Sequence, residues 1–212
     1  MSREEVLCMI KHIVLDIGNV LVTFEPVKHF SAYFKDEEKT KRLCSQVFGH
    51  DAWEKYDQGI YFMEDLKRIY QDAYPQDYED ISYILQHWLS LMKFKPETFT
   101  YAKQLQERGF EIYLLSNISE DSANYLKQTM PFFDAFEKGV LSYAVNINKP
   151  DKRIYEHLLH TYQLRPDETI FLDDSKLNVE QAQALGIHAF VFDTIENAIE
   201  DVERTIRSYE EC

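Results

Sequence analysis

The sequence predicts an α/β fold in which a doubly wound parallel sheet carries a helical cap domain, inserted after the first strand. Three observations predict this fold: an apolar run at residues 13–15 that ends on Asp16, a helical pattern over residues 24–95, and an alternation of helices and strands from residue 96. A chain of 212 residues is long enough for one well-buried α/β domain with a modest insertion.

The first strand is expected at residues 13–15, because a short Ile-Val-Leu run is typical of a buried strand. Asp16 follows it directly, and Gly18 supplies a turn signal. Open α/β sheets bind ligands beyond the carboxyl ends of their strands, and a carboxylate there can act as a nucleophile that forms an aspartyl-phosphate. Taken alone, an Asp before Ile-Gly-Asn is more often an ordinary turn residue.

Residues 24–95 show helical periodicity and no convincing strand. Apolar side chains recur there at the i, i+3, i+4 spacing of a helix with one buried face. The faces comprise Leu43, Val47 and Phe48; Phe62, Leu66, Ile69 and Tyr70; and Ile81, Ile84, Leu85, Trp88, Leu89 and Met92. These stripes are expected to form the core of a small helical bundle, with a minority of them lining a pocket.

From residue 96 the alternation of elements argues for a parallel sheet covered on both faces. The predicted strands span residues 111–115, 135–141, 169–172 and 188–192, and the predicted helices span residues 97–108, 120–129, 152–162, 179–185 and 195–209. Gly109 and Gly186 are placed to end two of these helices. The expected domains are a core of residues 1–23 and 97–212 and a cap of residues 24–96.

Charge and cysteine content exclude several classes of protein. The chain has 37 acidic and 23 basic residues and a formal charge of −14, which repels nucleic acid and anionic membranes. Its apolar runs are too short to span a bilayer, and its N-terminal residues lack a signal-peptide pattern. Cys8, Cys44 and Cys212 are far apart without a Cys-x-x-Cys pair, which predicts three free thiols in a cytoplasmic protein.

Polar residues follow other predicted elements. Ser116 and Asn117 end the strand at residues 111–115, where a hydroxyl can cap a helix or help helix amides to hold a phosphate. Lys149, just before a proline and a helix, is either a solvated charge or a counter-ion for the site. Asp173 and Asp174 repel each other unless a cation lies beside them. Mg²⁺ suits such a pair, although a helix N-cap with a spare acid is the alternative.

The types of these motifs, their order along the chain and their α/β context resemble the haloacid dehalogenase (HAD) superfamily over nearly the whole chain. The run Gly-Val-Leu-Ser at residues 139–142, before Lys149, agrees with this resemblance. Residues 16–20, Asp-Ile-Gly-Asn-Val, are most similar to the branch that contains bacterial α-D-glucose-1-phosphate phosphatase. The resemblance implies a HAD-like Rossmannoid core, with the helical stretch as the cap found after the first motif.

The resemblance also implies roles for individual residues. Asp16 is the catalytic nucleophile, Lys149 neutralises both Asp16 and the phosphate, and Ser116 with the Asn117 amide holds the phosphoryl oxygens. The three catalytic residues are thus Asp16, Ser116 and Lys149, and the substrate-binding residues are Ser116, Asn117 and Lys149.

For the metal, the resemblance implies a Mg²⁺ ion bound by the second oxygen of Asp16, the carbonyl of Gly18 and the carboxylate of Asp174. Asp173 would be either a ligand through water or a brace. Asn178 stands where many members have another Asp, which leaves the metal shell less negative than usual.

Gly18 is a departure from the pattern of most phosphatases in the superfamily, which carry there a second Asp as general acid and base. Such help contributes about 10² to 10⁴ in rate, so its loss weakens an enzyme without abolishing it. The glucose-1-phosphate phosphatase branch shares the Gly-Asn pattern, which favours activity. Glu25 or His29 is a hypothetical replacement, chosen for proximity in sequence.

The predicted function is a Mg²⁺-dependent phosphatase that hydrolyses small phosphomonoesters, with sugar phosphates as candidates, through an aspartyl-phosphate. Its expected partner is a small phosphorylated metabolite, and the oligomeric state stays open. One alternative is a HAD-type dehalogenase, which would have no use for the carboxylates of Asp173 and Asp174. The other is a catalytically silent phosphometabolite-binding or regulatory module, an interpretation that Gly18 keeps open.

Overall fold

The computed structural model describes residues 9–210, and within them the chain forms a five-stranded parallel sheet of order β3-β2-β1-β4-β5. The strands are β1 (His12–Leu15), β2 (Glu111–Ser116), β3 (Gly139–Leu141), β4 (Thr169–Asp173) and β5 (His188–Val191). In the central strand, Leu15 pairs with Leu114 of β2 and with Leu172 of β4. The carboxyl ends of these three strands therefore lie level at one edge of the sheet.

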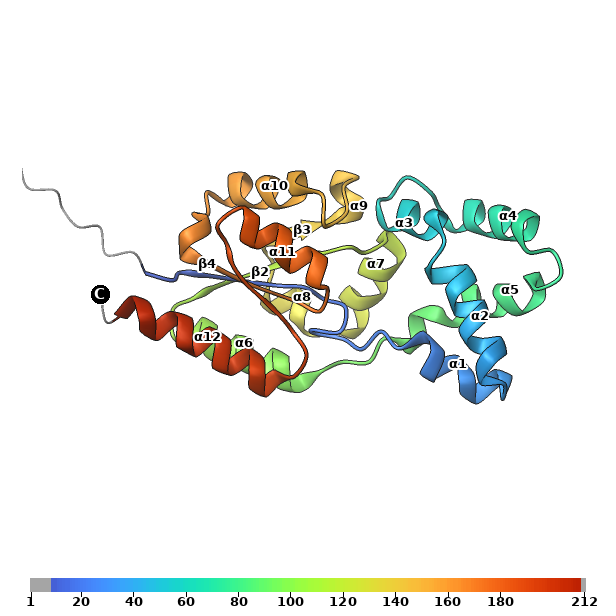
Figure 1. Cartoon of the computed structure of the whole chain (residues 1–212), viewed down its shortest axis with the longest axis horizontal. Coiled ribbons are helices and arrows are strands. Elements are labelled where there is room, and N and C mark those ends of the chain that lie inside the picture. Colours follow the sequence, from blue (N-terminus) through green and yellow to red (C-terminus); the bar gives the residue numbers. More distant parts are fainter. Residues whose placement is uncertain (1–8, 211–212) are drawn as a thin grey trace, which may run out of the picture.

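Helices cover both faces of the sheet, which confirms the doubly wound prediction (Figure 1). Alternate strand residues face opposite sides, as a pleated strand requires: Ile13 and Leu15 belong to one hydrophobic core and Val14 to the other. The first core is covered by α6 (Pro96–Glu107), α7 (Glu120–Thr129), α8 (Phe132–Ala135) and α12 (Ile195–Glu210), and the second by α10 (Lys152–Tyr162) and α11 (Lys176–Ala184). The short elements α9 (Ser142–Val145) and η2 (Pro166–Glu168) complete this part.

Between β1 and α6 the chain forms a helical segment, residues 26–91, beyond the carboxyl edge of the sheet (Figure 1). It comprises α1 (Pro26–Phe34), α2 (Glu37–Phe48), α3 (Asp51–Asp57), α4 (Met63–Ala73), α5 (Tyr78–His87) and the 3₁₀ turn η1 (Trp88–Leu91). The two connections to the sheet run side by side, because Thr23 N donates to Lys93 O at 2.8 Å and Lys95 N donates to Leu21 O at 2.9 Å. Among the described residues, none of the helices has the length and apolar character needed to cross a membrane.

The prediction of one continuous apolar helix face over residues 81–92 is wrong in one respect. The α-helix α5 ends at His87, and the 3₁₀ turn η1 follows it. The tighter turn brings the Trp88 ring edge-on to Trp53, with 4.9 Å between ring centroids. Tertiary packing of two large aromatic rings thus overrides the helical period.

Two other predicted elements need correction. The strand expected at residues 135–141 is only β3, Gly139–Leu141, because the preceding residues form α8 and β3 pairs with just three residues of β2. The helix expected at residues 179–185 begins earlier, at Lys176. Of the predicted free thiols, Cys44 is buried and unpaired, whereas Cys8 and Cys212 lie outside the described residues.

Candidate active site

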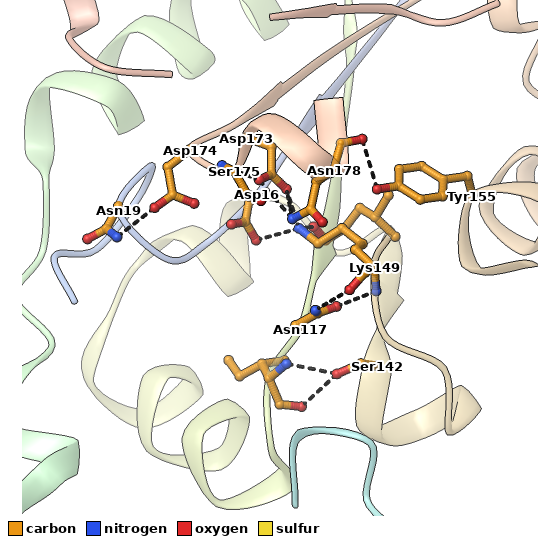
Figure 2. Close-up of polar contacts among 12 residues, drawn as sticks. Asp16, Asn19, Asn117, Ser142, Lys149, Tyr155, Asp173, Asp174, Ser175 and Asn178 are labelled. Atoms are coloured by element: carbon orange, nitrogen blue, oxygen red, sulfur yellow. Dashed lines mark hydrogen bonds and ion pairs between the residues drawn. The ribbon is translucent and has the colours of Figure 1, made fainter. Parts of the chain in front are cut away.

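The level strand ends bring together the polar residues that the sequence singles out. Asp16 follows β1, Ser116 ends β2, and Asp173 and Asp174 lie at the end of β4. Lys149 reaches the same point from the loop between α9 and α10 (Figure 2). The parallel register explains this meeting, because residues at the ends of neighbouring parallel strands are adjacent.

The ammonium of Lys149 is the centre of the site. Only 1% of its side chain is exposed, and Nζ lies 2.9 Å from Asp16 Oδ1 and 2.6 Å from Asp173 Oδ2. It also donates to the carbonyl of Leu115 at 2.7 Å. Burial acts to lower the pKa of Lys149, but the two carboxylates outweigh burial and raise it. The site therefore keeps a fixed positive charge beside Asp16.

Asp16 is almost buried, with 10% of its side chain exposed. Burial raises the pKa of its carboxyl to about 6, against the lowering effects of the Lys149 charge and of a hydrogen bond from Ser116. Asp173 adds a like charge that raises the pKa further. Oδ1 faces Lys149, and Oδ2 is the oxygen on the side of Gly18: a Cβ built at position 18 would lie 3.9 Å from it.

Asp173 is fully buried, and its contacts favour the bracing role. Oδ2 accepts hydrogen bonds from Lys149 and, at 3.1 Å, from Asn178 Nδ2. Oδ1 accepts from Ser175 N at 2.8 Å and from Asn178 Nδ2 at 2.9 Å. Asn178 thus supplies a neutral donor to Asp173, which holds the lysine in place.

Asp174 is exposed and points toward Asn19, whose Nδ2 donates to Oδ2 at 2.7 Å (Figure 2). Asn19 has a φ of 53°, in the left-handed region that Asn adopts more readily than most residues, and its Oδ1 accepts from Phe24 N at 2.7 Å. The spacing of the motifs did not reveal that Asn19 contacts both Asp174 and the backbone of Phe24. Its position in the Gly-Asn turn was the available signal.

The donor set at this edge fits a magnesium ion. Among the described residues, Asp16, Asp173 and Asp174 each offer a carboxylate oxygen, and these oxygens lie within 4.8 Å of one another. Asp16 and Asp173 both contact the ammonium of Lys149, so the carboxylate of Asp174 adds negative charge at this edge that a cation would offset. Hard oxygen donors are the ligands that Mg²⁺ prefers.

The side chain of Asn117 clamps the backbone of Lys149. Nδ2 donates to Lys149 O at 2.9 Å, and Oδ1 accepts from Lys149 N at 2.7 Å (Figure 2). In the loop after β2, Ile118 N donates to Oγ of Ser142, the first residue of α9, at 2.8 Å. The side-chain amide of Asn117 therefore positions Lys149.

A cavity of about 220 Å³ lies between this edge and the helical segment. It is lined by Ile17, Gly18, Asn19, Val22, Phe24, Trp53, Asp57, Trp88, Met92, Ser116, Asn117, Ile118, Ser122 and Asp174. Asp16 is not part of this lining, although the residues that follow it, Ile17 and Gly18, are. Glu25 and His29, both within the described part of the chain, lie outside it: Glu25 pairs with Lys28 at 2.8 Å, and His29 Nε2 lies 3.4 Å from Ser90 Oγ.

Asp57, the last residue of α3, is the acidic group that the helical segment contributes to the cavity. Burial raises the pKa of its carboxyl to about 7, against the lowering effect of a hydrogen bond from the backbone of Ser119. Asp57 is not predicted from the sequence, because a helix of seven residues carries little periodic signal and the fold alone brings this residue to the site.

Two curated proteins align with most of the chain. D-ribitol-5-phosphate phosphatase from Bacteroides thetaiotaomicron is 25% identical over 197 residues, which cover 86% of this chain and 91% of that protein. A sesquiterpene phosphatase from Aspergillus oryzae is 24% identical over 177 residues, which cover 84% and 87%. In other relatives the chain matches part of a longer protein, such as 34% of a drimenol cyclase from Aspergillus calidoustus.

Solved structures share the fold. A HAD family enzyme from Bacteroides thetaiotaomicron superposes with a TM-score of 0.70 at 23% identity, covering 89% of this chain and 96% of that one. The same enzyme in complex with magnesium and inorganic phosphate superposes with a TM-score of 0.66, covering 87% and 94%. A family model described as haloacid dehalogenase-like hydrolase matches residues 10–186. The chain therefore belongs to the haloacid dehalogenase-like hydrolase family.

Proposed function

We propose that this protein is a Mg²⁺-dependent phosphatase that hydrolyses small phosphomonoesters through an aspartyl-phosphate on Asp16. The observation that carries the proposal is the buried contact of Lys149 with Asp16 and Asp173, at 2.9 and 2.6 Å. Phosphoryl transfer depends on an in-line nucleophile and on fixed positive charge around the phosphoryl oxygens. The two relatives whose names describe phosphatases support the same chemistry.

In the first step, a carboxylate oxygen of Asp16 attacks phosphorus and the bond from phosphorus to the alcohol oxygen breaks. The ammonium of Lys149 offsets charge on the phosphoryl group, and Ser116 with the backbone amide of Asn117 donates hydrogen bonds to its oxygens. When bound by Asp16, Asp174 and the Gly18 carbonyl, Mg²⁺ would add positive charge beside the same oxygens.

In this proposal Asp57 supplies the proton for the leaving group. It takes the role of the Asp that most phosphatases of the superfamily carry at the position of Gly18. Its protonated carboxyl donates to the leaving alcohol oxygen. The resulting carboxylate then accepts a proton from the water that attacks phosphorus, which breaks the bond to Asp16 and releases inorganic phosphate. A general acid and base works best when its pKa is near the working pH, and a pKa of about 7 suits both roles.

The helical segment would act as the cap of the enzyme, with domain boundaries as expected from the sequence: residues 24–96 for the cap and residues 1–23 and 97–212 for the core. It contributes Asp57 and the apolar side of the cavity, and a cover of this kind excludes water from the reaction. A small phosphorylated metabolite as partner, sugar phosphates among the candidates, and a cytoplasmic location belong to the same proposal.

The test is release of inorganic phosphate from a panel of small phosphomonoesters, with and without Mg²⁺, for the wild type and for Asp16→Asn. We expect metal-dependent release that the variant loses. Chloride release from 2-chloro acids without release from any ester would establish the dehalogenase instead. Binding of esters without any release would establish a silent binding module.

A further inference from the structure

Half of the cavity lining is apolar. These side chains come from the turn after β1, from the helical segment and the residue that follows it, and from the loop after β2: Ile17, Val22, Phe24, Trp53, Trp88, Met92 and Ile118. The indole rings of Trp53 and Trp88 meet edge-on, and Tyr56 packs against both of them. The helical segment therefore gives the cavity an aromatic wall.

Several polar side chains of the lining are engaged within the protein. The Asn117 amide is used by Lys149, and the Asn19 amide by Asp174 and Phe24 N. Ser122 Oγ lies 2.8 Å from Ser119 Oγ.

Under the proposed function, Asp57 and Ser116 are used at the phosphoryl end, where Asp57 donates to the leaving oxygen and Ser116 donates to the phosphoryl oxygens. Beyond the end that faces the phosphoryl group, few partners for substrate hydroxyls remain among the described residues.

This lining favours esters of apolar alcohols over esters of alcohols that carry several further hydroxyls. A hydroxyl buried without a partner weakens binding by about 5- to 150-fold, whereas each buried methylene strengthens it by about fourfold. Several hydroxyls of a sugar or polyol would each meet aromatic or aliphatic carbon here. A hydrocarbon ring or chain of the same size meets surface of its own kind.

We propose that the substrates are phosphomonoesters of small apolar alcohols, alkyl, alicyclic or aromatic, rather than sugar or polyol phosphates. The proposal rests on the proposed phosphatase function and names its substrate class. The size of the cavity limits the alcohol, because about 220 Å³ is below the roughly 300–1,000 Å³ of ordinary ligand pockets. Trp53, Trp88 and Met92 are the residues that would set this specificity.

The kinetic test compares two esters with the same six-membered ring size, cyclohexyl phosphate and α-D-glucose 1-phosphate, by phosphate release in the presence of Mg²⁺. We expect kcat/KM to be at least tenfold higher for cyclohexyl phosphate. Equal values, or a preference for the sugar ester, would overturn the substrate class while leaving the phosphatase function standing.

A binding test separates failure of the substrate class from failure of the function. Trp53 and Trp88 are the only two tryptophans of the chain, and both line the cavity, so indole emission reports its occupancy. Titration with cyclohexylphosphonate, which has no ester bond, should change this emission at concentrations at least tenfold below those needed for inorganic phosphate. Such binding without release from any ester would refute the phosphatase function alone. Phosphonate binding no tighter than phosphate would refute the apolar site.

The variant test introduces a polar partner into the apolar wall. Met92→Gln keeps an unbranched side chain of similar length and adds an amide, so the preference for cyclohexyl phosphate should fall at least tenfold. Met63→Gln on α4, partly buried and outside the cavity lining, is the matched control and should keep the wild-type preference. Phe24→Tyr, at a half-buried lining position, makes the same test if Met92→Gln does not fold. An unchanged preference in both lining variants would contradict the proposal.

Discussion

Replacing Asp57 with Asn should slow phosphate release and, at high pH, stabilise the fold. Asn keeps the shape of the side chain and an oxygen for the Ser119 backbone N–H, but it has no acid proton. If Asp57 is the general acid and base, the rate should fall by about 10² to 10⁴. The wild-type rate of transfer to Asp16 should decline as pH rises through about 7, whereas the variant should lack this decline.

The stability effect follows from the raised pKa of Asp57, about 7 in the folded protein against 3.8 for an unperturbed Asp. A neutral carboxyl is favoured in the folded state, so its contribution to the free energy of unfolding is full below about pH 4 and is lost as pH rises through 7. A difference of about 3 pKa units sets an upper limit of about 4 kcal/mol. The titratable groups around Asp57 are Glu54 on the same helix, Tyr56 and Tyr70.

Urea unfolding at pH 5 and pH 8 tests the stability effect, and single-turnover release of the alcohol, measured from pH 5 to 9, tests the rate of transfer to Asp16. Relative to wild type, Asp57→Asn should gain stability between pH 5 and pH 8. Asp51→Asn, at an exposed position on the same helix, is the control and should change neither the pH profile nor this difference. Wild-type rates in Asp57→Asn, or an equal stability difference at both pH values, would refute the role of Asp57.

Three further predictions concern the groups around Asp16. In the Asp57→Asn background, Gly18→Asp should raise the rate of phosphate release at least tenfold, because a Cβ at position 18 meets only Asp16 Oδ2, at 3.9 Å. No gain in this double variant would contradict the prediction. Lys149→Met should abolish release and lower the free energy of unfolding by about 3–5 kcal/mol, since it leaves two buried carboxylates without their cation; urea unfolding measures the loss. Removal of divalent cations with EDTA should abolish release and added Mg²⁺ should restore it, whereas full activity in EDTA would exclude a metal at the acidic cluster.

The sequence was sufficient to predict the sheet and the meeting of its polar strand ends. A parallel sheet places the ends of its strands at one edge, so Asp16, Ser116 and Asp174 are brought together by topology alone. Lys149 was predictable by the resemblance, and its burial between two carboxylates follows from the length of its side chain and the position of its loop.

The cap side of the site was not predictable in the same way. Asp57 enters the cavity because α3 packs at that position in three dimensions, and no periodic pattern in the chain encodes it. The end of α5 at His87 likewise depends on contact of Trp88 with Trp53, which are far apart in sequence. Glu25 and His29 were chosen because they follow β1 closely, but proximity in sequence does not determine which side chains line a cavity.

The most direct test of the central claim is inorganic phosphate release by the wild type and by Asp16→Asn, in the presence of Mg²⁺, from a panel of esters that includes cyclohexyl phosphate and α-D-glucose 1-phosphate. We predict turnover by the wild type and a loss of at least about 10³-fold in the variant, because the nucleophile is removed while the shape of the side chain is kept. Release by Asp16→Asn at the wild-type rate, or no release by the wild type from any ester, would contradict the assignment of Asp16 as the nucleophile of a phosphatase.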